Sequence, residues 1–519
     1  MYRKIVLAPP RSRAAPVAIA LALCVPLLLW CVLTALATPF DHDESQYIAG
    51  AYFSSHMLVF RDFLYLQPPL HSWFLAPLAG LFPRDMVLAM RLATAATAFG
   101  VLLTLWKAQR IAGISRDSAA IATLLAGSTA AFQFTGSVVR NDMLATLLAS
   151  LAMLMLLSAL RSRRAEHWLL GGLLLGLATA TKLNFAPLAL ASGLFALHPG
   201  GRAGWKAAAW LSLGGLAGLS PMLLLYLVAP EPFTYGVLTF GATAPHSWYA
   251  ANGAEHELLF LEKLADLLKF LWKGPALIAL LLIGSRWIFD RNRTASAGRT
   301  LCRWMIGGGL LGAALPTPLQ VQYLMPLIPP LALGMGYLLD DARRWPFAAR
   351  EMLLGLLCLA AVPGLLKASG HIAVMARTGS PVLEAGSQAL WIGTTVRALA
   401  RDDGIVTLSP HLAVDSGLQV DPRFATGPFV YRSGSMITSA QARRMHVVTP
   451  ATLADLDRDP PAAILAGYEG GTRKLPLAPD AGLLRYAASR RYRGIVLPDG
   501  VGRLFVRLSP FRPGRRIMR

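Results

Sequence analysis

The sequence predicts a polytopic α-helical membrane protein that ends in a small α/β domain. Of the 519 residues, 55% are hydrophobic and only 15% are charged. Soluble proteins carry about 25% charged residues, so this shortage of charge indicates a membrane protein. Long apolar runs recur until about residue 370, after which short β-branched runs replace them.

Eleven apolar segments are predicted to form transmembrane helices. A helix needs about 20 apolar residues to cross a hydrocarbon core ~30 Å thick. Eight segments approach or exceed this length: 16–37, 86–106, 119–137, 141–160, 207–229, 272–289, 319–339 and 351–367. Three shorter segments, 168–181, 184–198 and 304–316, bring the total to about eleven. The first segment has no small-residue cleavage site after it, so we expect an uncleaved anchor.

Lys and Arg residues are unequally distributed between alternate loops. One set of loops, which includes the N-terminal segment, holds 19 of them, and the other set holds six. Basic loops stay on the cytoplasmic side. The N-terminus is therefore predicted to be cytoplasmic, and loop 39–85 and everything after residue 368 are predicted to face outward. The net charge of +21 reflects this topology, and nucleic acid is not an expected partner.

Residues 370–519 are predicted to form an outer α/β domain after a membrane domain over 1–369. The stretches "DDGIVTLSP", "PAAILAGYEG", "YRGIVLPDG" and "GRLFVRLSP" are short β-branched runs bounded by Gly, Pro or Asp, a pattern typical of strands. All four cysteines lie in the apolar runs before this domain, so no disulfide framework is expected in it. The ending "FRPGRRIMR" is predicted to be disordered or to lie on the membrane surface.

The first outer loop, 39–85, is far longer than a connection between packed helices requires. Its apolar and aromatic residues alternate irregularly with polar ones, which favours amphipathic helices lying at the membrane interface. Tyr52, Tyr65 and Trp73 are expected to anchor them at the level of the headgroups.

Three carboxylates lie within four residues at the start of this loop: Asp41, Asp43 and Glu44. A helix beginning near Phe40 would place Asp43 and Tyr47 on one face, with Glu44 beside it. Acids in a first helical turn also complement the helix dipole, which is an alternative explanation for any one of them. Three crowded like charges cost stability unless cations or a function offset them, so we predict a site.

A Pro-Pro pair makes the next part of the loop rigid. Pro68 and Pro69 favour an extended stretch with a fixed continuation, and the polar side chains of Gln67 and His71 flank them. A rigid turn between two interfacial helices would explain the Pro-Pro pair equally well. As part of a site, it would hold Gln67 and His71 near the acids.

Arg140, Asn141 and Asp142 form the outer junction between two predicted spans. A tight polar turn uses residues such as Asn and Asp in any case. The arginine is the unexpected residue, because it places a cation on the outer side, against the charge bias. Arg140 and Asp142 are therefore candidate site residues.

Two further polar positions face the same side of the membrane. Lys182 separates two apolar segments of about 14–15 residues, which would span only ~21–22 Å as helices. We therefore expect Lys182 in a cavity below the outer surface, where ionisable residues are typically functional; snorkelling to the interface is the alternative. Gln322 and Tyr323 begin a Pro-rich span and are candidates for substrate binding, although helix packing alone explains them too.

The order and sidedness of four motifs resemble those of the GT-C glycosyltransferases. The motifs are an Asp-Glu-x-x-Tyr sequence from Asp43, a Pro-Pro-Leu sequence from Pro68, an Arg-x-Asp sequence from Arg140 and a Thr-Lys pair ending at Lys182. The most similar group comprises the bacterial relatives of protein O-mannosyltransferases and of the aminoarabinose and galacturonic acid transferases that act on lipid A. The resemblance covers about residues 15–370.

The resemblance implies transfer of a sugar, with inversion, from a polyprenyl-phosphate carrier to an acceptor hydroxyl on the periplasmic side of a bacterial inner membrane. It maps the catalytic base to Asp43, with Glu44 beside it; Asp41 is an additional acid that could act instead. Arg140 and Lys182 map to the cations that hold the carrier phosphate. Several relatives have Lys, Glu or His where this chain has Gln67. The resemblance therefore leaves the sugar open, and the acceptor could be a lipid, a glycan or a protein.

Other functions remain as alternatives. A lipid or solute transporter would explain Lys182 and the many spans, but it predicts internal repeats, which the sequence does not show. A non-catalytic assembly protein could use the basic outer domain, where 20 Lys and Arg stand against 11 Asp and Glu. No His/Cys cluster has metal-ligand spacing; His42, between two acids, is the one hint of a metal site, and a divalent ion is left open.

Overall fold

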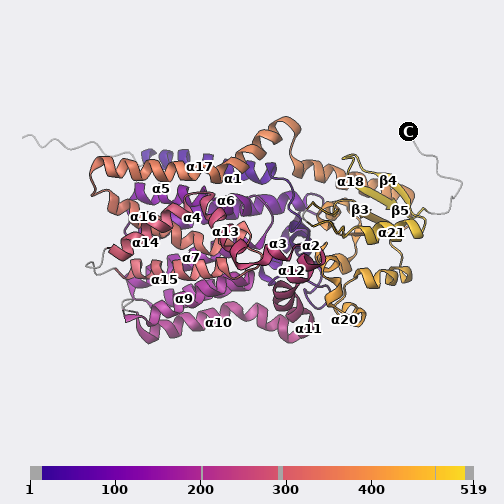
Figure 1. Cartoon of the computed structure of the whole chain (residues 1–519), viewed down its shortest axis with the longest axis horizontal. Coiled ribbons are helices and arrows are strands. Elements are labelled where there is room, and N and C mark those ends of the chain that lie inside the picture. The colour runs from indigo at the N-terminus through magenta and orange to yellow at the C-terminus, as the bar shows by residue number, and fades with distance from the viewer. Residues whose placement is uncertain (1–13, 200–202, 290–295, 474, 509–519) are drawn as a thin grey trace, which may run out of the picture.

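The computed structural model describes residues 14–199, 203–289, 296–473 and 475–508. The predictions for the terminal "FRPGRRIMR" segment and for the basic residues before residue 14 lie outside these ranges. Figure 1 shows a bundle of helices that run along the length of the molecule, with a sheet and short helices gathered at one end. Helices α2 (Glu44–Ser54) and α3 (Leu70–Leu81) lie where the two parts meet.

Each of the eleven predicted apolar segments is helical. They correspond to α1 (Ala14–Ala37), α4 (Met86–Ile111), α5 (Arg116–Gly127) with α6 (Ala130–Thr135), α7 (Asn141–Ser162), α8 (Ala165–Thr181), α9 (Ala186–Leu197), α10 (Gly204–Val228), α14 (Ala276–Phe289), α15 (Ala297–Ala314), α16 (Ile328–Ala342) and α17 (Phe347–Thr378). The connection between α10 and α14 contains α11 (Pro230–Thr234), α12 (Phe240–Ala251) and α13 (Phe260–Trp272).

Within the described residues, fewer than eleven helices are long and apolar enough to cross a membrane alone. Five of the described helices meet that standard, and six do if α13 and α14, bent by 95° to one another, form one span. The predicted span 119–137 is divided at Thr129, whose hydroxyl accepts a hydrogen bond from the Phe132 N–H and so begins α6 as a separate helix. The chain is a multi-pass membrane protein in which several helices are short or broken.

Glycines bring α8 and α10 into backbone contact. A Cβ on Gly172 would lie 1.9 Å from the carbonyl oxygen of Leu211, and a Cβ on Gly214 would lie 2.0 Å from that of Leu169. Small residues permit such close packing of helices in membranes. The contact fixes α8, and with it the position of Lys182, the residue that follows its last turn.

The sheet has the strand order β2-β1-β3-β5-β4, in which β1 is parallel to β2 and β3, and β5 is antiparallel to β3 and β4. The four predicted strands are confirmed as β1 (Gly404–Thr407), β3 (Ala463–Ala466), β4 (Arg493–Val496) and β5 (Arg503–Val506). The sequence did not predict β2 (Gln419–Val420), which is only two residues long. Helices α18 (Pro381–Leu399), α19 (Phe429–Arg432), α20 (Ser439–Arg444) and α21 (Ala481–Ser489) complete this part.

The predicted boundary at residue 370 falls inside α17, which continues to Thr378. Only two residues, Gly379 and Ser380, separate the end of α17 from the start of α18.

The first outer loop packs against the sheet part, so the prediction that its aromatic residues anchor it in the headgroups was wrong for Tyr65. Tyr65 is fully buried, and it shares one hydrophobic core with Ile48 and Phe53 of α2 and with Ile405 and Leu465 of the sheet. An amphipathic pattern shows that one face needs an apolar partner. Here the C-terminal part supplies apolar partners, among them Leu412 and Ile405.

Asp415 connects the sheet part to the membrane bundle. Its carboxylate accepts hydrogen bonds from the backbone N–H groups of Met86, at 3.0 Å, and Val87, at 3.3 Å, in the first turn of α4. Burial raises the pKa of Asp415 to about 6, although the two N–H donors oppose the shift. A raised carboxyl pKa means that the folded state holds a proton that the unfolded state releases.

We expect the contribution of Asp415 to stability to fall as the pH rises from the ordinary carboxyl pKa to about 6, because the unfolded chain releases this proton in that window while the folded chain still holds it. Asp415→Asn cannot titrate, so its melting temperature should depend less on pH, apart from a constant offset for one lost acceptor oxygen. Thermal unfolding of the purified full-length chain across this range measures the difference. Parallel pH dependences of the two proteins would contradict the assignment.

Candidate functional site

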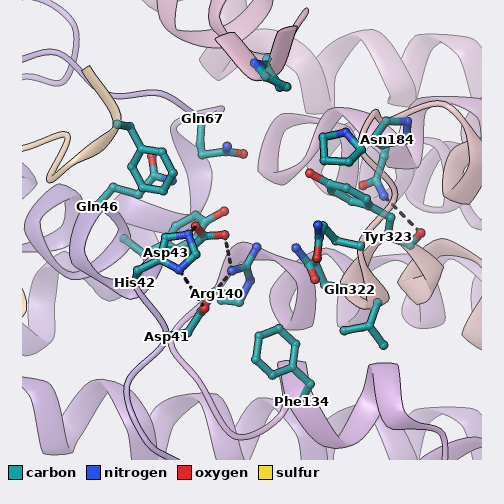
Figure 2. A pocket seen from close by; sticks show the side chains of 18 of the residues that line it. Asp41, His42, Asp43, Gln46, Gln67, Phe134, Arg140, Asn184, Gln322 and Tyr323 are labelled. Carbon is teal, nitrogen blue, oxygen red and sulfur yellow. Dashed lines mark hydrogen bonds and ion pairs between the residues drawn. The ribbon is translucent and has the colours of Figure 1, made fainter. Parts of the chain in front are cut away.

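A cavity of about 1090 Å³ lies where the first outer loop, the ends of several bundle helices and the C-terminal part meet. Figure 2 shows Asp43 and His42 on one side of the view, Gln322 and Tyr323 on the other, and Arg140 between them. Eight of the residues predicted from the sequence line the cavity: Asp41, Asp43, Tyr47, Gln67, Arg140, Lys182, Gln322 and Tyr323.

Arg140 connects the carboxylates at the centre of the site. It precedes α7 in an extended conformation, and its side chain is only 4% exposed. Its Nη1 donates to an oxygen of Asp41 at 2.5 Å and to an oxygen of Asp43, while its Nε donates to Asp142 at 3.3 Å. The guanidinium also lies 5.6 Å from the ring centre of Tyr47. A buried charge requires such partners, because desolvation alone would cost several kcal/mol.

Lys182 is buried and paired, as expected for a cavity residue and not for one that snorkels to the interface. Its Nζ lies 2.5 Å from Oδ1 of Asp142 and 5.2 Å from the ring centre of Tyr323. Asp142 is fully buried behind the cavity wall, where it contacts both Lys182 and Arg140.

Asp43 is held in its ionised form. Burial alone would raise the pKa of Asp43, but the charges and hydrogen bonds of Arg140 and His42 hold that pKa well below its ordinary value. The Nε2 of His42 lies 3.0 Å from Oδ1 of Asp43, and its Nδ1 lies 3.6 Å from Oδ1 of Asp41. Burial would lower the pKa of His42, but Asp43 outweighs burial and raises it. The described residues contain no group of three or more His, Cys, Asp or Glu side chains that could hold a metal ion.

Glu44 points away from the cavity, unlike Asp41 and Asp43. Its side chain is fully buried, and one carboxylate oxygen lies 2.6 Å from Nη2 of Arg91 in α4. The carboxylate also accepts hydrogen bonds from the backbone N–H groups of Val139 and Asp41, at 2.8 and 3.0 Å. Glu44 thus connects the start of the first outer loop to α4 and to the residue before Arg140.

The sequence reasoning missed Arg91. Besides Glu44, this fully buried arginine donates to the carbonyl oxygens of Ala35, Thr38 and Ser137 at 2.9, 3.1 and 2.5 Å. The signal was available: an arginine inside a predicted transmembrane segment indicates a polar partner within the protein.

Gln67 is fixed by a neighbour of Arg140. Asn141 donates from Nδ2 to Oε1 of Gln67 at 3.1 Å and to the carbonyl oxygen of Thr181 at 3.0 Å. His71 does not line the cavity; it is buried, and its ring packs edge-on against Tyr47 with centres 5.5 Å apart. His71 therefore supports the ring of Tyr47, which lines the cavity.

The C-terminal part supplies one wall of the cavity, which the sequence did not predict. Phe429 packs against the ring of His42 with centres 5.9 Å apart. Arg432 lies near the rings of Trp248 and Phe429, at 5.6 and 5.3 Å, and its Nη2 is 3.1 Å from Oε2 of Glu469. Nothing in a local sequence pattern indicates contacts over such separations.

We expect Glu44→Gln to destabilise the chain by about 3–5 kcal/mol, because it leaves the buried Arg91 guanidinium without its counter-ion. Adding Arg91→Met should recover part of this loss. Thermal unfolding of the purified protein measures both effects. Glu166→Gln is the matched control, because its partner Arg164 and Glu166 itself are 69% and 63% exposed, and such pairs contribute about 0–1 kcal/mol. Equal melting temperatures for Glu44→Gln and Glu166→Gln would refute the structural role.

Comparison with known proteins supports the fold. Residues 66–226 match a family model described as dolichyl-phosphate-mannose-protein mannosyltransferase. No curated protein sequence gives a significant match. Among solved structures, ArnT from Cupriavidus metallidurans bound to undecaprenyl phosphate superposes with a TM-score of 0.60 and 16% identity, over 95% of this chain and 98% of ArnT.

Two further structures are similar. The apo state of the same ArnT gives a TM-score of 0.60 at 15% identity, over 95% of this chain and 98% of the other. The apo oligosaccharyltransferase from Archaeoglobus fulgidus gives 0.52 at 11% identity, over 86% of this chain and 69% of the other. The chain therefore has a fold similar to that of these membrane proteins over most of its length, and residues 66–226 match the mannosyltransferase family model.

Proposed function

We propose that the chain is a membrane glycosyltransferase that moves a sugar from a polyprenyl-phosphate carrier to an acceptor hydroxyl. The family match to a lipid-phosphate-dependent sugar transferase and the fold shared with an undecaprenyl-phosphate-bound ArnT support this proposal. The observation that carries it is an ionised carboxylate, Asp43, in the wall of a large cavity between the bundle and the C-terminal part.

In the proposed reaction, Asp43 accepts the proton of the acceptor hydroxyl as that oxygen attacks the anomeric carbon. The bond between this carbon and the phosphate oxygen breaks, and the carrier phosphate leaves with the electron pair. A single displacement of this kind inverts the anomeric carbon. General base catalysis contributes about 10²–10⁴-fold to such steps, and a phosphate leaves without a general acid.

Arg140 and Lys182 are proposed to face the departing phosphate, where positive charge stabilises the transition state. Asp41 shares Nη1 of Arg140 with Asp43 and remains the alternative base. Glu44 is proposed to position the loop through Arg91 instead of contacting substrate, because it does not line the cavity.

The other predicted residues are proposed to shape the substrate-binding surface. Tyr47, Gln67, Gln322 and Tyr323 line the cavity and are placed to contact the donor or the acceptor. His71 and Asp142 would act from behind this surface, through Tyr47, Arg140 and Lys182.

The proposed location is a bacterial inner membrane, with the N-terminus cytoplasmic and residues after 368 periplasmic, as the unequal distribution of Lys and Arg predicts. The division into a membrane domain, 1–369, and a periplasmic domain, 370–519, belongs to the same proposal. The acceptor, whether a lipid, a glycan or a protein, would then meet the lipid-linked donor at the outer side of the bundle.

We expect Asp43→Asn to lower sugar transfer by about 10² or more, because an amide cannot act as the base. The assay follows a labelled sugar from a polyprenyl-phosphate donor in membranes with matched amounts of each variant. Asp41→Asn should lower transfer less.

Asp62→Asn is the matched control in the same outer loop. Asp62 pairs with the exposed Arg61, outside the cavity wall, so this variant should retain wild-type transfer. Full transfer by Asp43→Asn would overturn its role as the base, and no transfer by the wild type would favour the transporter alternative.

A further inference from the structure

The two cations that are proposed to face the phosphate, Arg140 and Lys182, are already paired with carboxylates, so they offer it little net positive charge. Arg140 pairs with Asp41, Asp43 and Asp142, and Lys182 pairs with Asp142. Two cations thus face three carboxylates, so this group carries a net negative charge. A protonated His42 would bring its net charge only to zero. A lipid-linked phosphate is an anion whose charge increases as the sugar leaves. It needs cations that the carboxylates do not already neutralise.

Two other lysines line the same cavity. Lys273 follows α13, and Lys367 lies in α17. Among the described residues, neither ammonium group has a carboxylate within ion-pair distance, and both lysines are exposed. Their recorded side-chain contacts are with aromatic rings: Lys273 Nζ lies 5.6 Å from the ring centre of Phe270, and Lys367 Nζ lies 5.9 Å from that of Phe134.

The other cations of the cavity wall differ from these two. Arg432 pairs with Glu469 at 3.1 Å, just as Arg140 and Lys182 pair with their carboxylates. Lys273 and Lys367 therefore carry the positive charge of this cavity that protein carboxylates leave uncompensated, within the part of the chain that the structure describes.

Helix α6 links both lysines to the centre of the site. The N–H of Ala130, at its start, donates to the carbonyl oxygen of Lys273 at 2.9 Å. Phe134, near its end, lies 5.6 Å from the guanidinium of Arg140 and 5.9 Å from the ammonium of Lys367. The ring of Phe134 is thus a neighbour of two cations, the buried Arg140 and the uncompensated Lys367. Figure 2 labels Phe134 and Arg140.

The cavity wall around these lysines is largely apolar. Phe270 and Phe134, whose rings lie near the two ammonium groups, line it together with Pro363 and Leu366 of α17. An apolar wall with two uncompensated ammonium groups matches the chemistry of an isoprenoid phosphate: the hydrocarbon needs apolar surface and the phosphate needs positive charge.

We propose that Lys367 and Lys273 also bind the phosphate of the lipid-linked donor, beside Phe134, and add positive charge to that of Arg140 and Lys182, which carboxylates already neutralise. This inference rests on the proposed function and adds two phosphate-binding residues that the sequence motifs did not indicate. Simple snorkelling is the competing explanation for a lysine near the end of a span. It predicts no preference for a phosphate in the cavity.

The test is direct binding of labelled undecaprenyl phosphate, compared with labelled undecaprenol, to the purified full-length chain in neutral-lipid nanodiscs. Lys367→Gln and Lys273→Gln should each weaken binding of the phosphate by about tenfold, since hydrogen bonds to charged groups have this strength. Binding of the alcohol should not change. Lys367→Arg should retain most of the affinity for the phosphate.

Lys206→Gln is the matched control, because Lys206 also lies over an aromatic ring, 5.9 Å from the centre of Trp205, but outside the cavity wall. It should bind both lipids as the wild type does. Wild-type affinity of the double variant for undecaprenyl phosphate would overturn the inference alone, as would equal losses for phosphate and alcohol. A wild type that does not prefer the phosphate would overturn the proposed function with it.

Discussion

The guanidinium of Arg140 places a positive charge where the cavity wall excludes most water, and three carboxylates are arranged around it. Asp41 and Asp43 come from the loop after α1, Asp142 from the first turn of α7, and all three contact this one side chain. Burying a charge costs several kcal/mol unless its partners compensate. The position of Asp43 is therefore tied to the position of α7, and the loop cannot move freely without exposing the charge.

A second buried pair lies behind the first. Glu44 and Arg91 join the same loop to α4, and the hydrogen bond from Val139 to Glu44 connects this pair to the residue before Arg140. The loop also shares a hydrophobic core with the C-terminal part, whose helix α19 contributes Phe429 and Arg432 to the cavity wall. The carboxylate of Asp43, which we propose as the base, is thus held by elements from both ends of the chain, whereas Lys273 and Lys367 have no carboxylate partner among the described residues.

Hydropathy predicted the helical segments, because a membrane span requires a long run of apolar residues. Short β-branched runs predicted the strands of the sheet. The count of Lys and Arg predicted that the ends of several spans lie on one side of the membrane. Eight of the site residues predicted at these ends and in the first outer loop line one cavity. Glu44 could not be distinguished from Asp43 in this way, because the choice depends on Arg91, 47 residues away. Amphipathic periodicity likewise could not reveal that α3 and the C-terminal part pack against α2.

The most direct test of this account is the pH dependence of sugar transfer by Arg140→Lys. Lysine keeps the charge but loses the planar fork that reaches several carboxylates at once. Because the carboxylates lose their fixed positions, transfer should fall by about 10² or more. The pKa of Asp43 should also rise from its lowered value, so on acidification transfer should fail at a higher pH than in the wild type. Wild-type rates with an unchanged acid limb would contradict the claim that Arg140 organises the site.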